Sequence, residues 1–117
     1  MQEKTTRQII RAARRILRQP GKWRKCAIGS PETGMCLLGG IAHAAGISLN
    51  APGLYETLRH TPAVNALKDV ILKKDLEFFG RYDDSAEIVY MFNDSADRKQ
   101  QEVVDLLTET LKSLPKE

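Results

Sequence analysis

The stretch that decides the fold spans residues 35–46 and reads MCLLGGIAHAAG. It contains no Asp, Glu, Lys or Arg, in a chain of 117 residues of which 28% are charged. Six of its twelve residues are glycine or alanine, and such small residues let other backbones come close. We therefore predict a central helix over 35–46 that ends at Gly46. Gly39 and Gly40 are expected to let the first and last helices approach it closely.

The rest of the chain also has helical patterning. Apolar residues recur at the three- and four-residue spacing of amphipathic helices, with Thr5 or Thr6 and Thr61 as candidate N-caps. Ser30, followed by Pro31, resembles a further helix start, although Gly34 leaves the beginning of the central helix open. The predicted helices besides the central one cover residues 5–18, 54–58, 61–79 and 97–113.

Residues 86–92 fit either a short helix or a strand. We favour a helix, because no second strand is evident that could pair with this segment. The sequence contains no internal repeat and no linker, and its length suits one domain. The predicted fold is therefore an all-α, compact single-domain bundle over residues 1–117, with about five helices around the central one.

Composition limits where the protein can act. No segment approaches the roughly 20 apolar residues that span a bilayer, so we expect no membrane contact. Arginines interrupt every candidate apolar core of a signal peptide, and we therefore expect a cytoplasmic protein. Cys26 and Cys36 are then expected to be free thiols, although the nine residues between them also permit a disulfide.

Charge is distributed very unevenly along the chain. Residues 1–31 carry nine bases and one acid, a net charge of +8, whereas the remainder has nine bases and fourteen acids, a net charge of −5. Within 5–18 every charged residue is an arginine, and like charges at helical spacing repel each other. This pattern favours a surface that binds an acidic partner. The predicted contact residues are Arg7, Arg11, Arg14, Arg15, Arg18, Lys22, Trp23, Arg24 and Lys25.

Three interpretations of the basic helix remain open. Its arginines could pair with the acidic C-terminal half of the same chain, bind the phosphates of a nucleic acid, or bind an acidic protein surface. Trp23 either covers the edge of the core or provides a stacking platform for a base. No helix-turn-helix signature supports sequence-specific DNA recognition. We predict a non-enzymatic binding protein, with nucleic acid or protein as partner.

An enzyme that uses Cys36 is the alternative function. A cysteine at a helix N-terminus has a lowered pKa, which activates the thiol. His43 cannot act as its base on one helix, because seven residues separate the two by about 10 Å and a dyad needs about 3 Å. His60 could approach from another element. The catalytic candidates Cys36 and His60 are therefore weak.

No metal or cofactor site is predicted. Cys26, Cys36, His43 and His60 match a zinc site in number, but they lack the paired spacing of structural zinc ligands. Phosphate-binding glycine loops and dinucleotide fingerprints are also missing from the sequence.

Two motifs resemble those of a family of small bacterial and bacteriophage proteins of unknown function. Trp23 followed by CLLGGI at 36–41 is similar to the family's tryptophan and Cys-Leu-Leu-Gly-Ala-Leu segment. FND at 92–94, leading into EVVDLL at 102–107, resembles its aromatic-Asn-Asp turn before a helix with Val-x-x-Leu-Leu. The resemblance covers about 8–112.

This resemblance implies a shared core but no function. It indicates a structural motif in which Asn93 and Asp94 fix a turn against the central helix. Gly40 and Ile41 replace the usual Ala and Leu, and His43 matches no position of the motif. The resemblance also favours an origin in a prophage or mobile element. A second copy could pack on the glycine-rich helix, so a homodimer is possible. The motif residues are Cys36, Gly39, Gly40, Asn93 and Asp94.

Overall fold

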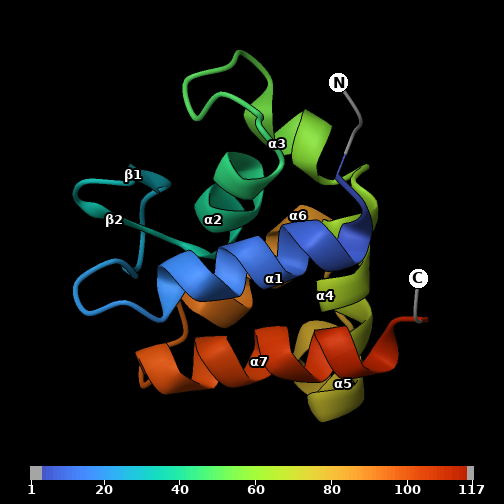
Figure 1. Ribbon diagram of the computed structural model, residues 1–117. Helices are drawn as coiled ribbons and strands as arrows, with labels where there is room; N and C mark the ends of the chain where they lie inside the picture. Colours follow the sequence, from blue (N-terminus) through green and yellow to red (C-terminus); the bar gives the residue numbers. More distant parts are fainter. Residues whose placement is uncertain (1–3, 116–117) are drawn as a thin grey trace.

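The computed structural model describes residues 4–115, and these form seven helices and one short hairpin (Figure 1). The predicted all-α fold is confirmed. In chain order the elements are α1 (Thr6–Leu17), β1 (Gly29–Ser30), β2 (Gly34–Met35), α2 (Leu37–Ala44), α3 (Leu54–Leu58), α4 (Pro62–Lys74), α5 (Leu76–Phe79), α6 (Ser85–Asn93) and α7 (Gln100–Ser113).

Helix α1 begins directly after its capping residue, Thr5. The Thr5 side chain accepts a hydrogen bond from the Gln8 backbone, and the Gln8 side chain accepts one from the Thr5 backbone. This reciprocal pair satisfies two backbone donors that a helix start leaves open. Ile10, Ala13 and Leu17 form the fully buried face of the helix. The prediction for 5–18 is confirmed.

The central helix is shorter than predicted. Its first helical residue is Leu37, because Met35 belongs to β2 and Cys36 is the extended N-cap. Gly46 follows the C-cap with a left-handed φ of 79°, as expected for a residue that ends a helix. Except for His43, every residue of α2 is buried.

The region before α2 is a hairpin and not a helix start, which corrects the interpretation of Ser30 and Pro31. Gly29 pairs with Met35, and Ser30 pairs with Gly34. Gly29 and Gly34 both have a positive φ, and a Cβ on Gly29 would lie 1.9 Å from the Gly34 carbonyl oxygen. This tight crossing requires glycine, so the chain reverses here instead of starting a helix.

The C-terminal half is close to the prediction. Thr61 caps α4 and Pro62 occupies its first turn. The predicted helix 61–79 is divided at Asp75, whose extended φ of −155° separates α4 from α5. Residues 86–92 are helical, as preferred, within α6. The last helix begins at Gln100, three residues after the predicted start.

Helices α1 and α7 lie side by side and run in opposite directions (Figure 1). The Gln100 side chain at the start of α7 donates to the carbonyl oxygens of Leu17 and Gln19 at 2.7 and 2.8 Å. Helix α1 also packs against α2, while α4 packs against α6 and α7. The radius of gyration of 12.9 Å is close to the value of about 13 Å for a single folded domain of this size.

Only one of the two expected close approaches to α2 is present. A Cβ on Gly40 would lie 2.7 Å from Leu17 Cδ1, so α1 does pack tightly on this glycine. Gly39 faces the Ile28 carbonyl oxygen, 2.5 Å from an added Cβ, and not the last helix. The glycine pair therefore accommodates α1 on one side and, on the other, the backbone of Ile28 just before β1.

Candidate functional site

Three arginines form an uncompensated basic surface on α1, which we call the arginine face: Arg11, Arg15 and Arg18. They follow one another by four and three residues, which places them on one side of the helix. All three are exposed. Within residues 4–115 their side chains form no hydrogen bond and no ion pair. Their charges are therefore directed to solvent.

Two other arginines of α1 are used to hold α7. Arg7 Nη1 donates to the carbonyl oxygens of Leu111 and Leu114 at 2.8 and 3.3 Å. Arg14 Nη1 donates to Thr108 Oγ1 at 3.2 Å. A cation at a helix C-terminus satisfies open carbonyl groups and interacts favourably with the helix dipole. Arg7 and Arg14 thus have a structural role in the packing of α1 on α7.

Some of the basic side chains after α1 also donate hydrogen bonds within the protein. Lys22 Nζ donates to the Pro31 carbonyl oxygen at 3.0 Å, and Lys25 Nζ donates to that of Ala96 at 2.8 Å. The Arg24 side chain is exposed and makes no hydrogen bond to another described residue. Of the nine predicted contact residues, four keep an unengaged charged side chain: Arg11, Arg15, Arg18 and Arg24.

Five acids among residues 4–115 have a basic partner elsewhere. The pairs join Glu56 and Asp84 to Arg59, Asp69 to Lys68, Glu109 to Lys74, and Glu102 to Arg98, and the Glu56 carboxylate also lies 3.7 Å from His60 Nε2. None of these pairs includes a base of residues 4–25. The interpretation that the basic helix pairs with the acidic half therefore finds no carboxylate contact in the described chain.

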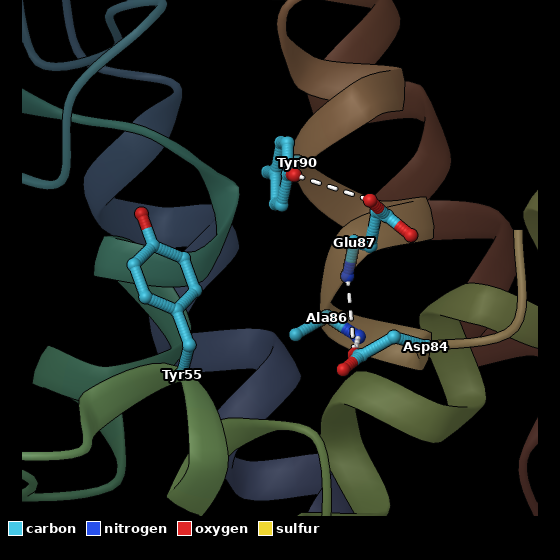
Figure 2. A pocket seen from close by; sticks show the side chains of 5 residues that line it. All are labelled: Tyr55, Asp84, Ala86, Glu87 and Tyr90. Atoms are coloured by element: carbon cyan, nitrogen blue, oxygen red, sulfur yellow. Dashed lines mark hydrogen bonds between the residues drawn. The ribbon is translucent and has the colours of Figure 1, made fainter.

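A cleft of about 470 Å³ lies between α3 and the first turns of α6 (Figure 2). Tyr55 from α3 and Tyr90 from α6 form its aromatic walls, with ring centroids 6.1 Å apart and ring planes at 72°. Tyr55 is 48% exposed, one of the few large hydrophobic side chains that the fold leaves open. Asp84, Ala86 and Glu87 complete the lining.

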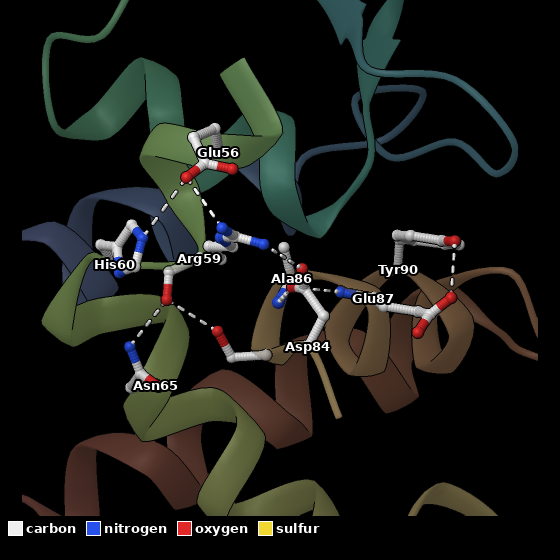
Figure 3. Close-up of polar contacts among 9 residues, drawn as sticks. Glu56, Arg59, His60, Asn65, Asp84, Ala86, Glu87 and Tyr90 are labelled. Atoms are coloured by element: carbon white, nitrogen blue, oxygen red, sulfur yellow. Dashed lines mark hydrogen bonds and ion pairs between the residues drawn. The ribbon is translucent and has the colours of Figure 1, made fainter. Parts of the chain in front are cut away.

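In this cleft, the negative charge of Asp84 is compensated by neighbouring donors (Figure 3). Its Oδ1 accepts from the backbone of Ala86 and Glu87 as the N-cap of α6, and its Oδ2 accepts from Arg59 Nη1 at 3.3 Å. Desolvation alone raises the pKa of Asp84, but these N–H groups and the guanidinium outweigh it and lower the pKa below 3.8. Arg59 also pairs with Glu56 at 2.8 Å, so two carboxylates flank this one cation.

The Glu87 carboxylate, in contrast to that of Asp84, has no cationic partner among residues 4–115. Its Oε2 accepts a long hydrogen bond of 3.4 Å from the Tyr90 hydroxyl, and it forms no ion pair within residues 4–115. Desolvation, followed by the negative charge of Glu87, raises the pKa of Tyr90. Desolvation also raises the pKa of Tyr55, with a further contribution from Cys36. Both phenols are therefore neutral near pH 7 beside an uncompensated carboxylate.

Cys36 lies at the N-terminus of α2, but it is buried. Its Sγ accepts from the Gly39 backbone at 3.4 Å. Desolvation raises the pKa of the thiol and outweighs the lowering by the N–H groups of Gly39 and Leu38. His43 and His60 are both exposed, and His60 pairs with Glu56 at 3.7 Å. The structure thus does not join Cys36 to a histidine, and Cys26 and Cys36 are free thiols.

Asn93 connects the two motifs of the sequence. It is fully buried, and its Oδ1 accepts from Trp23 Nε1 at 2.6 Å and from the Leu37 backbone at 3.1 Å. Its Nδ2 donates to the Arg24 carbonyl oxygen at 3.1 Å and to Asp94 Oδ1 at 2.9 Å. One side chain therefore joins α6, the segment before the hairpin and the start of α2.

Asp94 extends this hydrogen-bond network to Cys26. Its Oδ1 also accepts from the backbone of Cys26 at 2.8 Å. Cys26 is the one non-glycine residue with a positive φ among residues 4–115, at 65°. The carboxylate thus holds a backbone conformation that a side chain normally disfavours.

The sequence also matches a known family. A family model for a family of unknown function, DUF6197, matches residues 1–112. The chain belongs to DUF6197. No curated protein and no solved structure matches it.

In this DUF6197 chain, the family resemblance pointed to Asn93 and Asp94 but not to their hydrogen-bond partners, and the cleft was not predicted. Tyr55, Glu87 and Tyr90 lie on two helices more than 25 positions apart, and no local spacing links them. The one available signal was Tyr55, an aromatic residue in a five-residue helix too short to bury it.

Among the described residues 4–115 of this DUF6197 chain, no helix is both long and apolar enough to cross a membrane. Within the same range, no three side chains of His, Cys, Asp or Glu gather where they could hold a metal ion. In particular, Cys26, Cys36, His43 and His60 form no such group.

Proposed function

We propose that this protein is a non-enzymatic nucleic-acid-binding protein that contacts phosphates through the arginine face. The observation that carries the proposal is the set of three exposed guanidinium groups on one side of α1, without a carboxylate partner in residues 4–115. Guanidinium groups bind phosphates through paired N–H donors and remain charged at any physiological pH. Arg24 is available to extend the contact.

Nucleic acid is favoured over an acidic protein because the arginine face lacks an apolar anchor. Protein interfaces depend on a few buried aromatic or aliphatic anchors. The Trp23 indole N–H already donates to Asn93, and the exposed residues near the arginine face include Gln8 on α1 and Gln19 just after it. In the described chain, the exposed large hydrophobic residues lie on α3 and α5: Tyr55, Leu76 and Phe78.

The number of free arginines sets the expected strength and salt dependence. Each phosphate contact on duplex DNA contributes about −0.9 to the slope of log K against log salt, so three contacts give about −3. Between about 50 and 200 mM salt, the affinity would then fall roughly 40-fold. We expect weak binding without sequence preference. As part of the proposal, we place this binding in the cytoplasm of a bacterium or a phage-infected host, with the resemblance to such proteins as its support.

Fluorescence anisotropy tests the proposal. The probes are duplex DNA and single-stranded RNA of random sequence, about 20 units long, titrated at several salt concentrations. The double variant Arg11→Gln/Arg15→Gln should weaken binding and reduce the salt slope by about 2. The control Lys68→Gln/Lys73→Gln removes the same charge from α4 and should leave the slope unchanged.

Two results would overturn the proposal. One is no binding of either nucleic acid by the unmodified protein at low salt. The other is equal loss in the α1 and α4 variants, which would indicate a net-charge effect and no defined surface. Retention of poly-glutamate without binding of DNA or RNA would instead support an acidic protein as the partner.

A further inference from the structure

We propose that the cleft between α3 and α6 is a binding site for an alkylammonium group, with Tyr55 and Tyr90 as aromatic walls and Glu87 as counter-ion (Figure 2). The group could be carried by a free small molecule or by a lysine side chain of another protein. This site is separate from the arginine face and does not depend on the nucleic-acid proposal.

The aromatic walls suit a compact cation. Ring planes at 72° with centroids 6.1 Å apart form a corner and leave no parallel slot for a flat group. A roughly spherical ammonium or methylated ammonium can contact both walls, whereas a planar guanidinium can lie flat on only one. Attraction between a cation and the electron-rich ring face provides the affinity, and it is strongest where water is partly excluded.

The charges of the cleft also favour a cation. Asp84 is compensated by Arg59 and by two backbone N–H groups, so it does not attract a ligand strongly. Glu56 and Asp84 hold the Arg59 guanidinium from two sides, which keeps it away from Glu87 (Figure 3). Glu87 Oε1 has no hydrogen-bond partner within residues 4–115. Glu87 therefore gives the cleft a carboxylate without a cationic partner, beside two aromatic rings.

The volume and exposure of the cleft fit a small ligand. About 470 Å³ lies within the range of about 300 to 1,000 Å³ that is typical of small-molecule sites. A purely structural contact between the tyrosines would explain their edge-to-face geometry. An ammonium ligand would in addition use the exposed part of Tyr55, which is 48% exposed, and the carboxylate of Glu87.

Nuclear magnetic resonance titration of the ¹⁵N-labelled protein tests this site. The probes are choline, Nα-acetyl-lysine methylamide and 3,3-dimethylbutanol, which is the uncharged isostere of choline. We expect saturable shifts centred on residues 55 and 86–90 with a cationic probe and no saturation with the isostere. Saturation by choline alone indicates a free small molecule as ligand, and saturation by the lysine derivative alone indicates a protein side chain.

Matched variants separate binding from folding. Glu87→Gln keeps an acceptor for the Tyr90 hydroxyl but removes the charge, and it should weaken the cationic probe about tenfold. Glu77→Gln removes an exposed carboxylate from α5 and should have no effect. Tyr55→Leu keeps an apolar side chain and should weaken binding to a similar extent, with an unchanged circular dichroism spectrum. Equal shifts with the isostere, or unchanged affinity in Glu87→Gln, would overturn the proposal.

Discussion

At the scale of single residues, Cys36 shows two opposing effects on one thiol. Its place at the N-terminus of α2 exposes it to N–H groups that stabilise a thiolate, which favours nucleophilic reactivity. Burial removes water from the same sulfur, and this desolvation is the larger effect, so the pKa lies above the ordinary value of 9.0. The thiol therefore stays protonated near neutral pH. This result weakens the alternative of a thiol-dependent enzyme.

Thiol labelling in native buffer should distinguish the two cysteines. Cys26 is exposed and should react quickly, whereas Cys36 is buried and should react only when the fold opens. The variant Cys26→Ser isolates Cys36, and its labelling rate should match the opening rate measured by hydrogen exchange. Fast labelling of Cys36 at pH 7, without opening, would restore it as a candidate nucleophile.

At the scale of elements, the two glycines of α2 have different neighbours. Gly40 faces the Leu17 side chain of α1, whose terminal methyl groups can shift. Gly39 faces the Ile28 carbonyl oxygen, which belongs to the backbone and is also the acceptor of the Cys36 N–H. Added volume at these adjacent positions should therefore have unequal effects.

Alanine substitutions at these positions should separate the two contacts. Gly39→Ala should destabilise the protein by about 1–3 kcal/mol, because a Cβ would force the backbone near Ile28 to move. Gly40→Ala should change stability by less than about 1 kcal/mol, because alanine favours helix formation by about that amount and offsets the shift of Leu17. Urea unfolding at equal protein concentration measures both. A larger loss in Gly40→Ala would contradict this account.

At the scale of the whole molecule, Asn93 joins segments that are up to 70 positions apart in sequence. Its amide satisfies the indole N–H of Trp23, the first backbone N–H of α2 and a carbonyl group of the segment before the hairpin. The Leu37 N–H is buried and the other two groups are partly buried, so loss of the amide leaves several polar groups with a missing partner. An unpaired buried polar group costs about 1–3 kcal/mol.

Asn93→Ala should consequently reduce the free energy of unfolding by at least about 3 kcal/mol. Trp23→Phe removes the indole donor together with part of the ring, and the lost hydrogen bond should cost about 0.5–1.5 kcal/mol, with Asn93 still bonded to α2. Thermal and chemical unfolding of both variants provide the comparison. Similar losses in the two variants would mean that packing of the Trp23 ring, and not the amide, holds these segments together.

The sequence by itself determined the helical class and most helix termini. These features depend on local causes: Thr5 and Thr61 cap helices through neighbouring backbone groups, and apolar spacing defines the buried faces. The turn at Gly46 is likewise visible within a few residues. The charge asymmetry was equally evident from the sequence.

Only the tertiary structure decided which of these residues remain available to a partner. Arg7 and Arg11 are equivalent in sequence, but α7 ends beside Arg7 and provides carbonyl groups, whereas Arg11 faces solvent. The hairpin at Gly29 and Gly34 depends on a backbone contact that no helix pattern reveals. Tyr55 and Glu87 line one cleft only because the tertiary structure brings side chains of α3 and α6 to the same place. Contacts between distant segments depend on how the helices pack, and local patterns of residue type carry no information about that packing.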